Sequence, residues 1–230
     1  EEDATLRLLH YTPTLAGTGF SLMYQDQLYQ ASIPLLGKFN VYNTLAAMAV
    51  ALAEGIPIEE VLLALKTAPQ APGRFELVDE GQDFNVVVDY AHTPDGLQNV
   101  LTAARKLHPR RLITVFGCGG NRDKGKRPLM GRIAGAVSDV AIVTSDNPRW
   151  EAPMDIIDQI EAGIRQVCNN YLVEEDRGEA IRLALNMAEA GDMVVIAGKG
   201  HEDYQIIGNK VIHFDDREVA LEALAARGKS

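Results

Sequence analysis

The sequence predicts an α/β protein whose larger part is a Rossmann-like, doubly wound and mostly parallel sheet. From about residue 75 onward, near-continuous runs of Val and Ile alternate with segments of helical periodicity. Such strands are typical of a parallel sheet that helices cover on both faces. A stretch rich in Pro, Ala and Gly at 68–73 separates this pattern from a different one before it. We therefore expect one domain at residues 1–72 and a second at 73–230.

Composition and charge exclude several classes of protein. The 230 residues, 47% hydrophobic and 23% charged, are typical of a soluble chain with one large domain and part of another. A formal net charge of -10 argues against non-specific binding of nucleic acid. No run approaches the roughly 20 apolar residues that cross a bilayer. We therefore expect neither a nucleic-acid partner nor a membrane partner.

The cysteines and the start of the chain indicate the compartment. Cys118 and Cys168 are too few for a disulfide framework, and they have no metal-ligand spacing with the five histidines. We therefore expect no metal site and a reducing, cytoplasmic location. The chain starts on Glu1 without a signal-peptide pattern, and we expect it to begin inside a longer protein.

The first part reads as strands followed by helices. Three segments rich in β-formers predict an antiparallel meander: 5–10, 20–24 and 27–30. A helix is expected from Asn40, because apolar residues then recur at helical spacing until Gly55. Pro57 opens a second predicted helix. The breakers at 68–73 then end this part of the chain.

The second part alternates strands and helices in order. Buried strands are expected at 84–89, 111–116, 140–144 and 193–197. Helices are expected at 94–107, 128–137, 153–167 and 179–190. A hairpin around Gly208-Asn209 and a helix at 216–226 complete the chain.

Four polar loops follow the predicted strands, at the edge of the sheet where ligands bind in such folds. They span 89–94, 117–127, 145–150 and 198–204. In the first loop, Thr93 and Pro94 are explained by a helix start. Asp89 is not, and a carboxylate at the end of a hydrophobic strand suits a ribose hydroxyl.

The glycine-rich second loop favours an anion. From Gly120 it reads G-x-x-x-x-G-K-R, but Arg127 stands where a P-loop needs Ser or Thr to hold magnesium, so we reject a true P-loop. Four cations remain, which predict a site for a phosphate or a carboxylate, with a solvated basic loop as the alternative. They are Arg122, Lys124, Lys126 and Arg127.

The last two loops suit an amino acid. In Asp146-Asn147-Pro148-Arg149 the Arg fork can bind a carboxylate and the Asp an ammonium group, although a simple turn would explain the same residues. Gly198 and Gly200 allow close approach of the backbone to a ligand. Glu202 offers a second partner for an ammonium group, which we rank above acid–base chemistry because no nucleophile is evident.

With these loops assembled, the chain resembles the Mur ligase family. The matching stretches are 37–47, 73–76, 89–94, 117–128, 146–149 and 197–205. They are most similar to members that join meso-diaminopimelate to UDP-N-acetylmuramoyl-L-alanyl-D-glutamate. The resemblance implies that 1–72 is the C-terminal part of a central ATP-binding domain and 73–230 is the Rossmann-like C-terminal domain that binds the amino acid.

The resemblance also implies roles for individual residues. ATP would be contacted by Asn43, Arg74, Asp89, His92 and Thr93. The amino acid would be held by Arg122, Asp146, Asn147, Pro148, Arg149, Gly198 and Glu202. Lys124 would be catalytic, by stabilising charge on the transferred phosphate. Arg149 matters most for the choice of substrate, because its fork binds a terminal carboxylate and repels a terminal ammonium group; lysine-adding relatives lack it.

The family reaction implies further partners. ATP phosphorylates the D-glutamate side chain to an acyl phosphate, which the amine of meso-diaminopimelate then attacks. ATP and Mg²⁺ are therefore expected, with the P-loop, the magnesium ligands and a carbamylated lysine outside this sequence. We expect the isolated chain to be a monomer and inactive. An L-lysine-adding ligase, a phosphoryl-transfer module and a non-catalytic module that binds amino acids or nucleotides are the alternatives.

Overall fold

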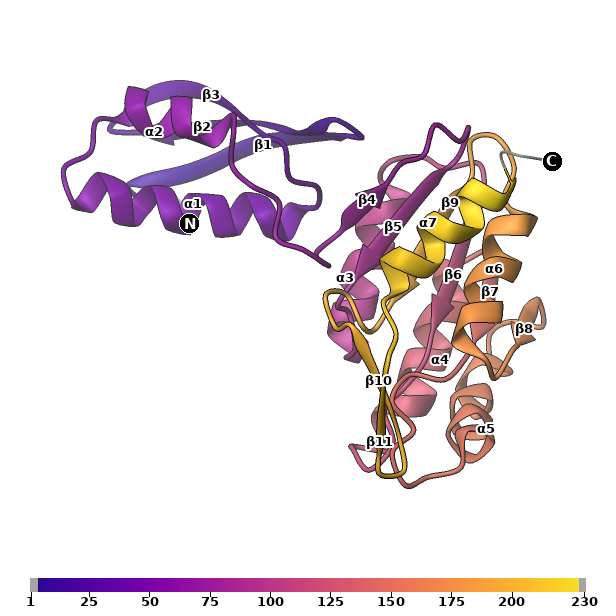
Figure 1. Cartoon of the computed structure of the whole chain (residues 1–230). Helices are drawn as coiled ribbons and strands as arrows, with labels where there is room; N and C mark the ends of the chain where they lie inside the picture. The colour runs from indigo at the N-terminus through magenta and orange to yellow at the C-terminus, as the bar shows by residue number, and fades with distance from the viewer. Residues whose placement is uncertain (1–3, 228–230) are drawn as a thin grey trace. The chain divides into compact units, whose positions relative to one another are not determined.

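The computed structural model describes residues 4–227, so Glu1, where the first predicted domain starts, lies outside the described residues. The chain divides into two compact units, Glu1–Ala71 and Pro72–Ser230 (Figure 1). Among residues 4–227, no helix is long and apolar enough to cross a membrane.

The first unit is a three-stranded antiparallel sheet with two helices. Its strands are β1 (Leu6–Thr14), β2 (Gly17–Tyr24) and β3 (Gln27–Ile33), in that order across the sheet. The helices are α1 (Lys38–Ala53) and α2 (Ile58–Leu65). Apolar residues from strands and helices form one core: Phe20, Leu22, Ile33, Val41, Leu45, Met48, Ile58 and Val61. The predicted meander and both helices are therefore confirmed.

The second unit contains a six-stranded sheet in the order β4-β5-β9-β6-β7-β8. Its strands are β4 (Glu76–Val78), β5 (Asn85–Asp89), β6 (Leu112–Phe116), β7 (Val140–Val143), β8 (Tyr171–Val173) and β9 (Met193–Ala197). All neighbours run parallel except β4, which is antiparallel to β5. This confirms the mostly parallel α/β fold.

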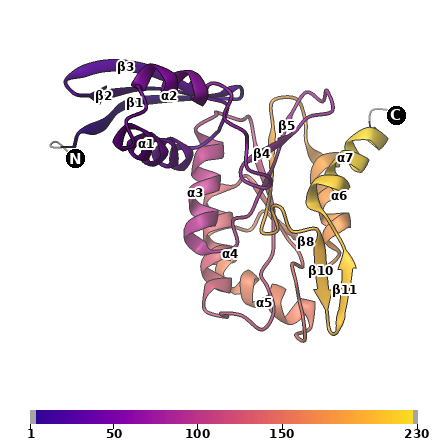
Figure 2. The ribbon, with the colours of Figure 1, turned by 60° about the vertical axis from the view of Figure 1, so that its left-hand side comes forward.

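Helices cover both faces of this sheet (Figure 2). One face carries α3 (Pro94–Arg105), α4 (Lys126–Val137) and α5 (Pro153–Ile164), and the other carries α6 (Arg177–Met187) and α7 (Asp216–Arg227). Side chains alternate between the faces along each strand. Val86 and Val88 of β5 therefore pack with Ala184 of α6 and Leu224 of α7 in one core.

A short hairpin projects from the carboxyl edge of the sheet. It consists of β10 (Tyr204–Ile207) and β11 (Lys210–His213), joined through Gly208 at φ 58°. An isolated parallel bridge joins Arg149 to Ile207, and Gly208 N donates to Arg149 O at 2.7 Å. The hairpin thus supports the loop that carries Arg149.

The structure adds two strands that the sequence did not predict. Both β4 and β8 have only three residues, which is too short to show a period of two. Three predicted helix starts were also late, including that of α1, which begins at Lys38 instead of Asn40. Helix α4 begins at Lys126 instead of residue 128, and α6 begins at Arg177 instead of residue 179 because Asp176 caps it by accepting from Glu179 N at 2.9 Å.

The position of β9 decides which loops meet. The chain moves from β5 through β6 and β7 to β8, then returns through α6 so that β9 lies between β5 and β6. The ends of four strands are aligned, with Asp89 paired to Ala197, Ala197 to Phe116, and Phe116 to Val143. The four polar loops therefore leave one edge as a contiguous set.

Candidate functional site

A pocket of about 570 Å³ lies where these four loops meet. Every loop contributes to its wall, which confirms that the polar loops surround a common space. The lining residues are Tyr90, His92, Thr93, Pro94, Gly119, Arg122, Asp123, Gly125, Lys126, Leu129, Asp146, Asn147, Arg149, Gly198, Glu202 and Tyr204. Of the twelve predicted site residues in this unit, eight line the pocket and four do not: Arg74, Asp89, Lys124 and Pro148.

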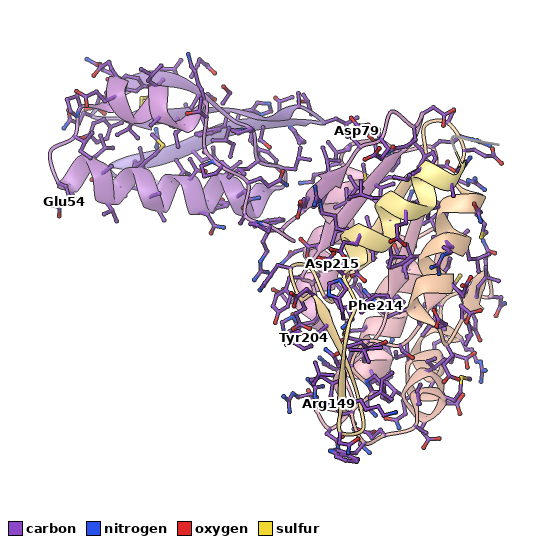
Figure 3. All side chains as sticks on the ribbon, in the orientation of Figure 1. Glu54, Asp79, Arg149, Tyr204, Phe214 and Asp215 are labelled. Atoms are coloured by element: carbon purple, nitrogen blue, oxygen red, sulfur yellow. The ribbon has the colours of Figure 1, made fainter. Side chains whose placement is uncertain are left out.

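Two arginines lie side by side at one wall of the pocket. A Cβ added to Gly119 would lie 2.9 Å from Arg149 Nη1 and 3.7 Å from Arg122 Cγ, so both side chains converge on this glycine. Arg149 Nη1 donates to Gly120 O at 3.0 Å. Figure 3 shows Arg149 beside the turn of the β10–β11 hairpin. Both arginines line the pocket, so they bring positive charge to this wall.

Two carboxylates provide the opposite charge. Asp146 and Glu202 both line the pocket. Asn147, which follows Asp146 in the same loop, links this loop to that of Glu202 by donating from Nδ2 to Glu202 Oε2 at 3.1 Å. Glu202 Oε1 also accepts from the Tyr90 hydroxyl at 3.3 Å. Among residues 4–227, the only partner of the buried Asp146 Oδ1 is Lys199 Nζ, with which it forms an ion pair at 3.3 Å. A pocket with paired cations and paired carboxylates suits a zwitterionic ligand.

Lys199 is a buried cation beneath this wall. Its side chain is 0% exposed, and Nζ lies 3.3 Å from Asp146 Oδ1. Burial lowers the pKa of Lys199, and the neighbouring Asp146 opposes this shift. The sequence showed Lys199 only as a residue between two glycines, a pattern that is equally compatible with an exposed side chain.

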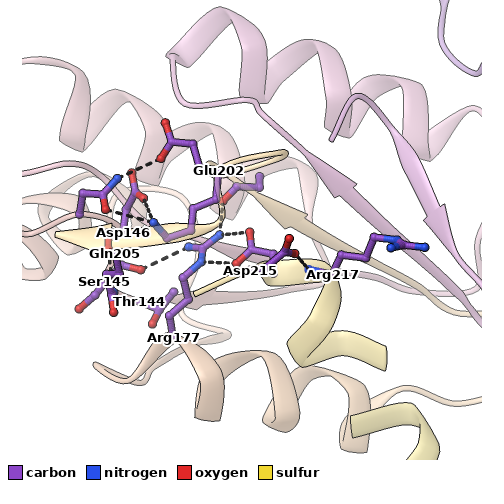
Figure 4. Close-up of polar contacts among 12 residues, drawn as sticks. Thr144, Ser145, Asp146, Arg177, Glu202, Gln205, Asp215 and Arg217 are labelled. Atoms are coloured by element: carbon purple, nitrogen blue, oxygen red, sulfur yellow. Dashed lines mark hydrogen bonds and ion pairs between the residues drawn. The ribbon is translucent and has the colours of Figure 1, made fainter. Parts of the chain in front are cut away.

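A second buried ion pair lies deeper in the unit. Arg177 and Asp216 are both inaccessible and form two hydrogen bonds of 2.7 Å. Arg177 also donates to Ser145 O and Ala197 O, at the ends of two loop-bearing strands (Figure 4). The pair thus ties the carboxyl edge of the sheet to α7. The sequence did not reveal it, because the two residues are 39 positions apart.

The glycine-rich loop is held by Glu151. Its two carboxylate oxygens each accept from Arg127 at 2.9 Å, and Lys124 Nζ lies 3.3 Å away. Chiefly because of Arg127, and also through Asn121 N, the pKa of Glu151 is lowered to about 2. Arg127 was expected to serve an anionic ligand, and this is corrected: it is 0% exposed and binds Glu151 because helix α4 starts early and turns it inward.

The residues predicted to contact ATP differ in their relation to the pocket: His92 and Thr93 line it, whereas Asp89 and Arg74 do not. Asp89 is 5% exposed, and its oxygens accept from Phe75 N and Ala91 N, both at 2.8 Å. Burial raises the pKa of Asp89, against the effect of these donors and Arg74. The Thr93 hydroxyl caps α3 by accepting from Gly96 N.

Aromatic and basic side chains gather around Tyr90 near these residues. The rings of His92 and His201 have centroids 4.6 and 5.0 Å from that of Tyr90, and Arg74 Cζ lies 4.8 Å above it. Asn43 belongs to the first unit, where it is exposed on α1.

Comparison with known protein families identifies both units. The model of the Mur ligase glutamate ligase domain matches residues 73–200, and that of the Mur ligase middle domain matches residues 1–51. The chain belongs to the Mur ligase family. In this Mur ligase chain, the mostly parallel sheet and the four loops lie in the C-terminal domain, which follows the end of a middle domain.

Two curated relatives are 50% or more identical to this Mur ligase chain over the residues that align with it. It is 50% identical over 226 residues to the UDP-N-acetylmuramoyl-L-alanyl-D-glutamate–2,6-diaminopimelate ligase of Solibacter usitatus, covering 98% of the chain and 46% of the relative. The ligase of the same name from Syntrophomonas wolfei is 54% identical over 216 residues, covering 94% and 44%. The chain thus spans slightly less than half the length of these relatives.

Solved structures agree with this assignment. A 2,6-diaminopimelate ligase structure superimposes with a TM-score of 0.73 at 39% identity, covering 100% of this chain and 47% of the other. A UDP-N-acetylmuramate-alanine ligase from Thermotoga maritima has the same TM-score at 18% identity, covering 100% and 47%, and shows only the shared fold.

Proposed function

We propose that this chain is the amino-acid-selecting part of a cytoplasmic ligase that adds meso-diaminopimelate to UDP-N-acetylmuramoyl-L-alanyl-D-glutamate at the expense of ATP. The curated relatives with about 50% identity carry this activity in their names. We further propose that the ligase acts as a monomer.

The observation that carries the proposal is the charge pattern of the pocket. Each end of meso-diaminopimelate has one carboxylate and one ammonium group. Arg122 and Arg149 provide guanidinium groups for a carboxylate, and Asp146 and Glu202 provide acceptors for an ammonium group. Binding one end in this way leaves the other amine free to attack. L-Lysine keeps its α-amine free to attack only when its other end lies in the pocket. That end has an ammonium group but no carboxylate, so it would leave the arginines unpaired.

The remaining proposed roles concern the nucleotide and the phosphate. Asn43, Arg74, Asp89, His92 and Thr93 are proposed to contact ATP, which supplies the phosphoryl group that activates the acceptor. Lys124 is proposed to stabilise phosphate charge, for which it would have to leave Glu151; its side chain is 64% exposed and free to turn.

Magnesium is part of the proposed reaction, but these residues do not fit a complete site for it. Within residues 4–227 there is no group of three or more His, Cys, Asp or Glu side chains that could hold a metal ion. We therefore derive no step through magnesium from this chain.

Titration calorimetry of the 230-residue chain with meso-diaminopimelate and with L-lysine tests the proposal. We expect L-lysine to bind at least about tenfold more weakly, because one charge-assisted contact contributes about 1.5–3 kcal/mol. Equal affinities would show that the arginines do not select the ligand. A chain that binds neither ligand would contradict the proposed amino-acid site.

Replacing Arg149 tests its role in the complete ligase. Arg149→Ala should lower kcat/KM for meso-diaminopimelate by about 10- to 100-fold, from the loss of the same charge-assisted contact. Arg132→Ala is the matched control, because Arg132 is exposed on α4 and pairs with Gln166. Unchanged kcat/KM in Arg149→Ala would remove this loop from substrate selection.

A further inference from the structure

The side chain of Lys199 is completely buried directly beneath the pocket wall. The flanking glycines have positive φ angles, 125° at Gly198 and 54° at Gly200. Residues other than glycine rarely adopt these backbone conformations. Glycine on both sides therefore allows the loop to turn the lysine inward. A buried ammonium group is costly unless charge and hydrogen bonds compensate it, so its surroundings should explain its presence.

Three oxygens surround Lys199 Nζ. Tyr204 O accepts at 2.7 Å and Asn147 Oδ1 at 3.2 Å, while Asp146 Oδ1 forms an ion pair at 3.3 Å. An ammonium group has three N–H donors, so these contacts match its capacity. Lys199 therefore joins two pocket-lining residues, Asp146 and Asn147, to the base of the β10–β11 hairpin.

The contact with Asn147 fixes the direction of the amide. Asn147 Oδ1 accepts from Lys199 Nζ and also from Ile206 N at 2.9 Å, which uses both of its lone pairs. The amide nitrogen must then point the other way, where it donates to Glu202 Oε2 at 3.1 Å. A reversed amide would direct its oxygen at the Glu202 carboxylate and its NH₂ group at two donors.

We propose that Lys199 is a positioning residue of the amino-acid site, which orients Asn147 and Asp146 so that Asp146 and Glu202 present their carboxylates to the ammonium group of the ligand. This inference rests on the proposed function of the pocket. Lys199 does not line the pocket, so it acts through these neighbours. The Arg149 guanidinium group donates to the backbone oxygens of Gly120 and Asn147 and not to Lys199, so binding of the ligand carboxylate should be independent of Lys199.

Two ligands separate this role from a general structural one. Meso-diaminopimelate carries carboxylates and ammonium groups, whereas pimelate has the same carbon chain and carboxylates without the ammonium groups. In the 230-residue chain, Lys199→Met should lower the affinity for meso-diaminopimelate about tenfold or more, because a charge-assisted contact is lost. The affinity for pimelate should stay unchanged. Lys210→Met is the matched control at an exposed lysine of β11 and should change neither affinity.

The outcomes are distinguishable. If the wild type binds no meso-diaminopimelate, the proposed function fails. If the wild type binds it and Lys199→Met binds it equally well, the role of Lys199 is overturned while the proposed function stands. If the affinities of the variant for both ligands fall equally, Lys199 supports the whole pocket and the specific role is overturned.

A second measurement needs no ligand, and its first part uses only the wild-type chain. In the wild-type chain labelled with ¹⁵N-asparagine, the side-chain NH₂ protons of Asn147 should exchange slowly with solvent, because the amide is 3% exposed and held at both ends. Where Lys199→Met folds, with a circular-dichroism spectrum like that of the wild type, the same protons should exchange at least about tenfold faster. Fast exchange in the wild type would contradict the fixed amide.

Discussion

At the scale of single residues, the site depends on a backbone conformation that residues other than glycine rarely adopt. Arg149 has φ 55°, in the left-handed region that non-glycine residues rarely adopt. The hairpin holds it there, because Arg149 N donates to Ile206 O at 3.0 Å and Arg149 O accepts from Gly208 N at 2.7 Å. This conformation directs the guanidinium group toward Gly119 and Arg122.

Gly119 leaves the space that the two arginines occupy. In Gly119→Ala the new methyl group would lie 2.9 Å from Arg149 Nη1, so the guanidinium group must move. We expect meso-diaminopimelate affinity to fall about tenfold or more, as for loss of one charge-assisted contact. The thermal midpoint should change little, because the atom displaced is the end of a flexible side chain. Calorimetry and a thermal melt measure the two effects.

The control for this substitution is Gly19→Ala. A Cβ at Gly19 of β2 would meet nothing within 4 Å, so both affinity and stability should be retained. Full affinity in Gly119→Ala would show that the arginine pair is not the carboxylate site.

At the scale of elements, glycines allow helices α4 and α5 to pack with their backbones in contact. A Cβ at Gly163 of α5 would lie 1.8 Å from Pro128 O, and one at Gly131 of α4 would lie 2.1 Å from Ile160 O. No larger residue fits at this separation. The contact at Pro128 places the first turn of α4, which follows the glycine-rich loop, directly against α5.

Glu151 joins the same loop to the loop of Arg149. It binds Arg127, Lys124 and Asn121 N, and Asn121 Oδ1 in turn accepts from Trp150 N at 3.0 Å. One carboxylate thus fixes the relative positions of the loops that carry Arg122 and Arg149.

The charge of Glu151 predicts how stability depends on pH. Its folded pKa, about 2, is below the ordinary value of 4.5, so its contribution is complete above pH 4.5 and is lost as pH falls toward 2. Glu151→Gln should therefore have a lower thermal midpoint than the wild type at pH 6. The difference should shrink between pH 4.5 and 2, where wild-type Glu151 becomes protonated. Thermal melts across this range measure it; a constant difference would mean that the carboxylate charge is not responsible.

At the scale of the whole molecule, all pocket residues come from the unit Pro72–Ser230. This unit has its own sheet, with apolar cores that helices from the same unit complete. Amino-acid binding should therefore not need the first unit.

A chain truncated to residues 72–230 tests this independence. We expect it to unfold in one cooperative transition and to bind meso-diaminopimelate within about twofold of the 230-residue chain, since independent domains fold alone. Calorimetry on both chains gives the comparison, and residues 4–71 alone serve as the control that should not bind. A truncated chain that folds and loses affinity would show that the first unit contributes to the site.

Much of the architecture was determined by the sequence alone. Runs of Val and Ile predicted the parallel strands β5, β6, β7 and β9, and the polar loops after them predicted the edge where the pocket lies. These features are local, because strand and helix periodicities and loop composition can be read within a short window. The same windows identified Arg122, Arg149 and Glu202 as candidates, and all three line the pocket.

Only the tertiary structure decided how these parts combine. The insertion of β9 between β5 and β6 brings the loop of Glu202 beside those of Tyr90 and Asn147, although 112 and 55 residues separate these pairs. It also decided which cations face the pocket: Arg127 and Lys199 are buried against carboxylates, while Arg122 lines the wall. Strand order and the pairing of buried charges depend on contacts between distant segments, and no local pattern in the sequence encodes them.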